Sequence, residues 1–239
     1  MNVIYFYHIP KCSGSFIGKY LERLNDKNKN SIHIPFINIL ELQYHILPKM
    51  IKNLPELKYD NVFLHHHHSP YGIKNIHDSI EQTKNKIISN GGVFFLFTSV
   101  REPISYITSH VNYSNNLPQT NLWPKEYRWD YDRAINEKWF YNHQSKYLLY
   151  NRHSIDLWEK DISLLDMKIE LQLFDKIYKT DNLTAIKNDL RNKISNVEEC
   201  WEDEKVNATD YKLLLSEEQK KAYLANNQID NWLYKNATN

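Results

Sequence analysis

The sequence predicts an α/β fold, in which a parallel sheet is flanked by helices and the C-terminal half is mainly helical. Three short β-rich runs carry this prediction, because each ends in polar residues and leads towards a helical pattern. They cover residues 3–7, 61–64 and 93–100. The last run is almost continuously apolar, which is typical of a strand buried on both faces.

Helical periodicity follows the first run and dominates the second half. Ile17, Tyr20, Leu21 and Leu24 recur at the spacing of one helix face. Pro103 follows the third run, at a position where a helix can begin. The second half predicts a short strand near 175–178 and helices over 134–150, 155–172, 182–195 and 216–237. No repeat or linker divides the chain, so we expect one domain over residues 1–239.

Composition limits the possible functions. Hydrophobic residues make up 41% of the 239 residues and charged residues 25%, which is ordinary for a globular chain. A formal net charge of +1 argues against a general nucleic-acid or membrane-surface binder, which needs a large basic excess. Cys12 and Cys200 are too few for a disulfide framework, and the first residues do not form a signal peptide. We therefore expect a cytoplasmic protein.

The first candidate site is the loop that begins at His8. Lys11, Ser13, Gly14 and Ser15 lie between the first strand and the first helix. Backbone N–H groups at a helix start, hydroxyls and a lysine together form an anion cradle. The loop is not a Walker A motif, because its lysine precedes the glycine. The alternative is an ordinary strand-to-helix turn with Ser13 or Ser15 as N-cap.

The second candidate site follows the third strand. Arg101 stands at the end of that strand, and Pro103 begins a helix on which Ser109 lies away from the apolar face. Arg101 and Ser109 are therefore placed to hold a second phosphate. The alternative is an ion pair between Arg101 and Glu102 or another carboxylate.

The third candidate site is the run of four histidines at the end of the second strand. Alternation along a strand places His65 and His67 on one face and His66 and His68 on the other. Imidazole titrates in the range that a general base requires. One alternative is a metal site, although no third ligand motif such as HExxH is present. The other is a polar strand end with solvated histidines.

These motifs together resemble the sulfotransferases that use 3'-phosphoadenosine-5'-phosphosulfate (PAPS), especially the carbohydrate branch with the heparan and uronyl 2-O-sulfotransferases. Residues 10–15 are similar to that family's P-K-T-x-G-T/S loop, with Cys12 in place of threonine. Arg101 to Ser109 matches R-D/E-P-x-x-x-x-x-S at the same spacing. Residues 142–148 look like N-x-Q-T-R-x-L, with Lys146 in place of arginine, and 214–216 and 227–234 look like the closing helices.

The resemblance implies a P-loop-like sheet, PAPS as donor, PAP as product and no metal. It implies that the 5'-phosphosulfate binds at Lys11, Cys12, Ser13, Gly14, Ser15 and Phe16. It implies that Arg101 and Ser109 bind the 3'-phosphate. It also implies that Lys11 stabilises the negative charge that develops on the leaving oxygen. Alignment on the aromatic residue after the histidines favours His66 and His68 as candidates for the base.

Together these features predict transfer of a sulfuryl group from PAPS to a hydroxyl of a carbohydrate, with no nucleic acid or membrane as partner. Residues 123–131 are rich in aromatics. These residues could stack on a sugar ring, belong to the core or form a mobile lid. One alternative function is an ATP-dependent P-loop phosphotransferase. The other is a non-catalytic relative that binds a nucleotide or a glycan.

Overall fold

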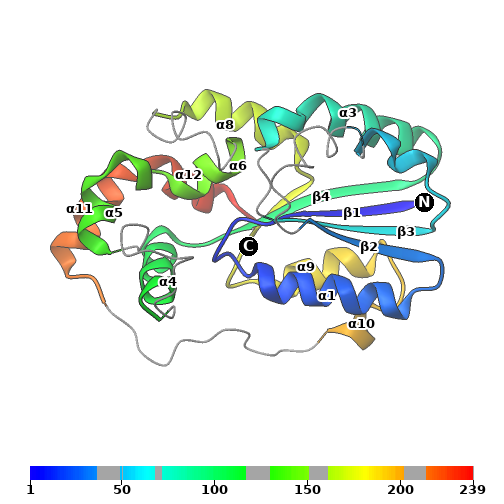
Figure 1. Cartoon of the computed structure of the whole chain (residues 1–239), viewed down its shortest axis with the longest axis horizontal. Helices are drawn as coiled ribbons and strands as arrows, with labels where there is room; N and C mark the ends of the chain where they lie inside the picture. Colours follow the sequence, from blue (N-terminus) through cyan, green and yellow to red (C-terminus); the bar gives the residue numbers. More distant parts are fainter. Residues whose placement is uncertain are drawn as a thin grey trace, which may run out of the picture.

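A five-stranded parallel sheet forms the centre of the protein (Figure 1). The structure, a computed structural model, describes residues 1–36, 49, 51–67, 72–116, 130–150, 161–201 and 214–238. The strand order is β2-β3-β1-β4-β5. The strands are β1 (Asn2–Tyr7), β2 (Ser31–Phe36), β3 (Asn61–His66), β4 (Val93–Val100) and β5 (Lys176–Lys179). The α/β class predicted from the sequence is confirmed.

Two hydrophobic clusters cover the two faces of the sheet. Val3, Tyr5 and Tyr7 of β1 belong to one cluster, and Ile4 and Phe6 belong to the other. This separation follows from the pleat, which directs successive side chains to opposite faces. The three central strands are buried on both sides, which explains why their sequences read as apolar runs.

The two edge strands were harder to predict. The short strand expected near residues 175–178 is β5, displaced by one residue. The sequence did not predict β2, which contains Pro35. Proline has no N–H group to donate, so it is tolerated at a sheet edge and weakens a strand prediction.

Helices cover both faces of the sheet and the carboxyl ends of its strands. Figure 1 shows α1 and α9 on one face, α3 and α8 on the other, and α4, α5, α11 and α12 beyond the carboxyl ends. The α-helices are α1 (Gly14–Lys27), α3 (Ile73–Ser89), α4 (Pro103–Asn116), α5 (Tyr131–Asn136), α6 (His143–Leu149), α8 (Leu164–Glu170), α9 (Leu183–Arg191), α10 (Val197–Cys200), α11 (Glu217–Asn226) and α12 (Gln228–Asn236). The short 3₁₀ turns are η1 (Leu54–Glu56), η3 (Lys138–Phe140) and η4 (Leu171–Leu173).

Two long helices expected from the sequence are interrupted. The segment 134–150 contains the end of α5, then η3 and α6, and the segment 216–237 divides into α11 and α12 at Asn227. Residues 151–160 and 117–129, which carry part of another predicted helix and most of the aromatic loop, lie outside the described residues. The helix predicted over 182–195 ends at Arg191.

The interruptions place α6 and α12 so that each caps the other. Asn142 adopts a left-handed conformation (φ 50°) before α6, and its Oδ1 accepts hydrogen bonds from the amides of Ile229 and Asp230. The Asp230 carboxylate in turn accepts from the amides of Gln144 and Ser145 at 3.1 and 2.8 Å. The amides at a helix start have no partner within the helix, so these side chains satisfy both starts at once.

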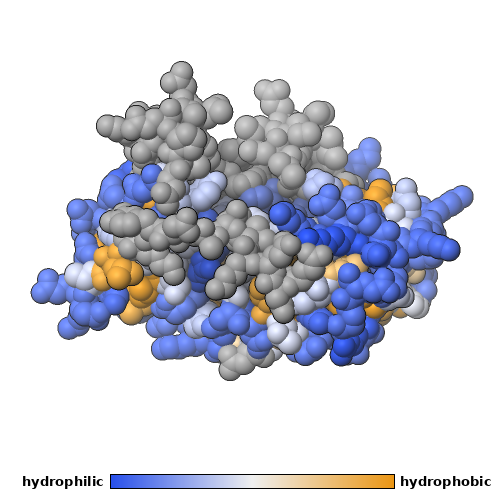
Figure 2. Space-filling view, turned by 90° about the horizontal axis from the view of Figure 1, so that it is seen from below, coloured by the Kyte–Doolittle hydropathy of each residue, from blue (hydrophilic) through white to orange (hydrophobic). Residues whose placement is uncertain are grey.

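The described residues on the face seen in Figure 2 are mainly hydrophilic. Figure 2 views the molecule from below, and hydrophobic residues gather on that face only in small patches. Among the described helices, none has the length and apolar character needed to cross a membrane.

The buried Asp230 predicts a pH dependence of stability. Burial raises the pKa of its carboxyl from 3.8 to about 6, although the Ser145 and Gln144 donors oppose the rise. The folded protein therefore binds this proton more tightly than the unfolded chain does. The contribution of Asp230 to the free energy of unfolding should fall by roughly 2–3 kcal/mol as the pH rises through this interval, and stay constant above it.

Urea unfolding of the wild type and of Asp230→Asn, measured between pH 4 and pH 7, checks this. The stability advantage of the wild type over the variant should shrink as the pH rises. Parallel pH profiles for the two proteins would contradict the assignment.

Candidate functional site

The candidate site lies where the carboxyl ends of the central strands meet. Strand β1 pairs with β3 on one side and with β4 on the other. The helices that follow β1 and β3 leave towards opposite faces of the sheet (Figure 1). In open α/β sheets, such a change of direction creates a crevice at the strand ends, where ligands bind. The three polar segments singled out in the sequence all begin at this edge.

The first loop leaves a set of amides available for an anion. Lys11 and Ser13 adopt left-handed conformations, with φ of 62° and 59°. Ser13 precedes α1 without a side-chain capping bond, and in the described structure the amides of residues 13–16 donate to no acceptor. Alternating left-handed residues before a helix start produce a concave array of N–H groups that suits a phosphate.

Lys11 and Arg101 bring two positive charges to this edge. The Lys11 ammonium is half-buried and lies 3.9 Å from the centre of the Tyr113 ring on α4. Burial, and then the charge of Arg101, lower the pKa of Lys11 to about 8. Two like charges held near one another are unfavourable unless an anion binds between them, so the arrangement is typical of an anion site.

Arg101 does not pair with Glu102, which was the alternative reading of this loop. The Glu102 carboxylate accepts from the amides of Ile104 and Ser105 and thereby caps the start of α4. In the part of the chain that the structure describes, the Arg101 guanidinium makes no ion pair. Ser109 is half-buried on the same helix, nearly two turns further on.

The side chain of Gln144 joins the two loops. Its Oε1 accepts from the Cys12 thiol at 3.2 Å and from the Arg101 amide at 2.9 Å. Its Nε2 donates to the Arg101 carbonyl at 2.9 Å. His110 of α4 adds a hydrogen bond to the backbone of Pro10. The sequence pattern indicated no role for His110, and it indicated Gln144 only as a match to the glutamine of N-x-Q-T-R-x-L.

The side chain of Cys12 supports the first loop from the side of the core. Its side chain is fully buried and points to Gln144, and burial raises the pKa of the thiol far above its usual range. Cys12 stands where the resembling family has threonine, so the loop has no hydroxyl at this position. In this orientation the Cys12 side chain faces the core, so its contact is with Gln144.

Lys146, which stands where the resembling family has arginine, supports a turn. It is buried, and its ammonium donates to the Lys138 carbonyl at 2.6 Å. Burial lowers the pKa of Lys146 to about 8. The position therefore contributes to packing around η3.

His66 is enclosed on the face of the sheet that α3 covers. It is 2% exposed, and its Nδ1 lies 2.7 Å from the Tyr5 hydroxyl. Burial, and then His65, lower its pKa to about 3. The lowered pKa favours the neutral form of the ring, and its enclosure leaves it almost no contact with solvent. His68 lies outside the described residues, so the prediction of a base there stays a prediction.

On the opposite face, His8, His65 and His67 lie together beside the first loop. His8 Nδ1 and His65 Nε2 are 3.1 Å apart, and the rings of His8 and His67 stack with centroids 3.7 Å apart. Among the described residues, no three His, Cys, Asp or Glu side chains are arranged to hold a metal ion. The imidazoles pack face to face and form a wall beside the cradle.

Two glycines of α1 make room for this wall. A Cβ at Gly14 would lie 1.7 Å from Nε2 of His8, and a Cβ at Gly18 would lie 2.5 Å from Cε1 of His65. The absence of a side chain at Gly14 therefore makes room for the His8 ring.

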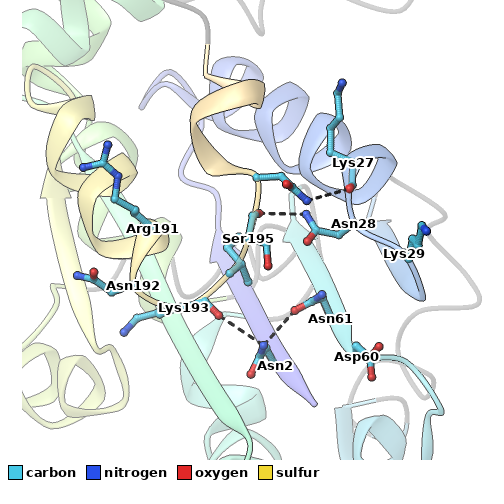
Figure 3. Close-up of a pocket in the computed structure, with 12 residues that line it drawn as sticks. Asn2, Lys27, Asn28, Lys29, Asp60, Asn61, Arg191, Asn192, Lys193 and Ser195 are labelled. Atoms are coloured by element: carbon cyan, nitrogen blue, oxygen red, sulfur yellow. Dashed lines mark hydrogen bonds between the residues drawn. The ribbon is translucent and has the colours of Figure 1, made fainter.

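A separate open pocket of about 650 Å³ lies at the opposite edge of the sheet (Figure 3). Asn2 Nδ2 donates there to Asn61 Oδ1 at 3.0 Å and to the Lys193 carbonyl at 3.4 Å. Asn28 donates to the Ser195 carbonyl at 3.3 Å. These amides tie the starts of the strands to the ends of α1 and α9. We therefore interpret the pocket as a place where strands and helices are joined, through the hydrogen bonds drawn in Figure 3.

Comparison with known proteins adds little to this geometry. No protein-family model and no curated protein matches the chain. Among solved structures, the chain is similar to the crystal structure of a fungal RNA kinase, with 14% identity and a TM-score of 0.32. The match covers 83% of this chain and 94% of that one. A likeness this low carries no argument about activity.

The close approach of Gly18 to the His65 ring predicts a coupling between substitutions at these two positions. Gly18→Ala should destabilise the protein by about 1–3 kcal/mol, because the new methyl group displaces the His65 ring. This loss should appear although alanine is the better helix former by about 1 kcal/mol. His65→Ala should remove the clash, so the double variant should be more stable than the sum of the single changes.

Denaturant unfolding of the four proteins measures this coupling, with Lys19→Ala on the exposed side of α1 as control. Simple additivity of the two changes would show that the ring does not occupy this space.

Proposed function

We propose that this protein is a sulfotransferase that moves a sulfuryl group from PAPS to a hydroxyl, with a carbohydrate as acceptor. The observation that carries the proposal is the meeting of two cationic loops at one edge of the sheet. One offers unused helix-start amides with Lys11, and the other offers Arg101. The motif resemblance supports a donor that carries phosphate groups at both its 5' and 3' positions.

In this proposal the donor spans the two loops. The amides of residues 13–16, with Lys11, hold the 5'-phosphosulfate. Arg101 and Ser109 hold the 3'-phosphate, which distinguishes PAPS from ATP. Arginine suits this task because its guanidinium matches the geometry of phosphate oxygens.

The transfer proceeds in line. The acceptor oxygen forms a bond to sulfur while the bond between sulfur and the bridging phosphate oxygen breaks, and PAP leaves with the negative charge on that oxygen. Lys11 lies in the loop that holds this group and stabilises the charge as it develops. The proton of the acceptor hydroxyl passes to an imidazole.

We assign the base to His67. It follows β3, it is half-buried, and it stacks on His8 beside the first loop. A base needs access to the acceptor and a pKa near the working pH, and enclosed His66 has neither.

Binding of the desulfated product tests the donor site. Calorimetric titration with PAP, ATP and AMP should show that PAP binds the most tightly. Arg101→Ala should weaken PAP binding about 10- to 100-fold, because a charged hydrogen bond to the 3'-phosphate is lost. Arg191→Ala, an arginine at the opposite edge of the sheet, is the matched control and should leave the affinity unchanged.

Binding of ATP with Mg²⁺ but not of PAP would replace the proposal with a phosphotransferase. Binding of none of the three nucleotides would indicate a relative without a nucleotide site.

Single histidine replacements test the base. His67→Ala should lower turnover with PAPS about 100-fold or more while PAP affinity is kept, because only proton transfer is affected. His66→Ala should instead destabilise the fold by about 2–4 kcal/mol, because it leaves a cavity and an unpaired Tyr5 hydroxyl. The measurements are steady-state sulfation of a panel of sugar acceptors and urea unfolding. Full turnover in the His67 variant would refute this assignment.

A further inference from the structure

The amide of Gln144 is placed to control the spacing of the two anion-binding loops. It contacts both of them at once: the thiol of Cys12 and both backbone polar groups of Arg101, all within 3.2 Å. Because the Arg101 amide and carbonyl are both engaged, the backbone from which the guanidinium extends is held in place. Cys12 directly precedes the amides of the cradle, so the same side chain holds the first loop as well.

Gln144 is itself held firmly. It is fully buried in the first turn of α6. Its own amide and that of Ser145 donate to the buried Asp230 carboxylate, which also accepts the Ser145 hydroxyl at 2.6 Å. Buried polar groups that satisfy one another in this way are costly to move, because each would lose its partner in a medium of low dielectric constant.

A second hydrogen bond joins the same two segments. The Ser99 hydroxyl, from the end of β4, donates to the Cys12 carbonyl at 2.5 Å. The first loop is thus attached to β4 through the Cys12 carbonyl and to Gln144 of α6 through the Cys12 side chain. Ser99 fixes the distance between loop and strand, and Gln144 extends that constraint to Arg101, which follows the strand.

We propose that Gln144 is a positioning residue that determines specificity: by fixing the separation of the two loops, it selects a nucleotide with two separate phosphate groups over one with a single group. The inference rests on the proposed function for its nucleotide. The affinity of a ligand that contacts both loops depends on the distance between them, whereas the affinity of a ligand that contacts one loop does not. Small errors of position at such a site cost large factors in binding or rate.

The test compares Gln144→Met with Ser145→Ala. Methionine keeps the approximate length and volume of glutamine and removes the three amide hydrogen bonds to the loops. Ser145→Ala removes a hydrogen bond to Asp230 in the same turn and touches neither loop. Calorimetry with PAP and AMP, which differ in the 3'-phosphate, measures selectivity. Gln144→Met should weaken PAP binding 10-fold or more and AMP binding less than 3-fold, and Ser145→Ala should preserve the ratio of the two affinities.

A second measurement needs no nucleotide. In a Cys200→Ser background, Cys12 is the one thiol in the chain, and its burial should make it react slowly with an aromatic disulfide reagent. Gln144→Met should raise the labelling rate about 10-fold or more, because the thiol loses its partner and the loop loses its attachment. Ser145→Ala should leave the rate within about 2-fold of the parent.

The outcomes separate the two proposals. Equal effects of both substitutions on selectivity and labelling would overturn the inference, because Gln144 would then act only through the stability of α6. Unchanged selectivity and labelling in Gln144→Met would overturn it too. If the parent binds neither nucleotide while Gln144→Met alone accelerates labelling, the proposed function fails and the link between the loops stands.

Discussion

The position of β1 between β3 and β4 decides which side chains can meet. All of the ladders are parallel, and Tyr7 at the end of β1 pairs with His66 on one side and with Thr98 on the other. Strands β1 and β3 therefore end level, and β4 ends at Val100, two residues further on, so the segments that follow the three strands emerge side by side. Residues separated by about a third of the chain, such as Lys11 and Arg101, become neighbours because of this register and not because of any affinity between them. Burial, and then the charge of Arg101, lower the pKa of Lys11, so the two cations repel one another and the hydrogen-bonded sheet keeps them close.

A buried polar network connects this edge to the C-terminal helices. Asp230 caps α6, Asn142 caps α12, and Gln144 extends the network to the backbone of the second loop. A half-satisfied network of this kind is less stable than an apolar core, whereas a complete one is rigid. The helices beyond the strand ends are thereby attached to the sheet by directional bonds. An apolar contact permits sliding, and these bonds do not.

The sequence predicted the features that depend on local pattern. Apolar runs located the three central strands, and polar residues at their ends located the loops with Lys11 and Arg101. Features that depend on a distant partner were missed or misplaced. Asn142 and Asn227 read as ordinary positions within helices, because their role as caps appears only when α6 and α12 meet. Strand β2 was missed because Pro35 is acceptable only at an edge, and the sequence does not say which strand is the edge.

Both the sequence pattern and the packing of the helices are needed to predict which residues of the histidine run lie near the first loop. Alternation along the strand correctly places His65 and His67 on one face of the sheet and His66 on the other. It does not tell which of the two faces is covered by a helix with large side chains. The missing information lies in α1, where Gly14 and Gly18 are four residues apart and so share one helix face. A helix with two glycines on the face that packs against a sheet leaves space there, and aromatic or imidazole rings from the strand ends fill it. The glycine pair therefore identifies the side of the sheet on which imidazoles remain near the cradle, and it is this face that also carries His8.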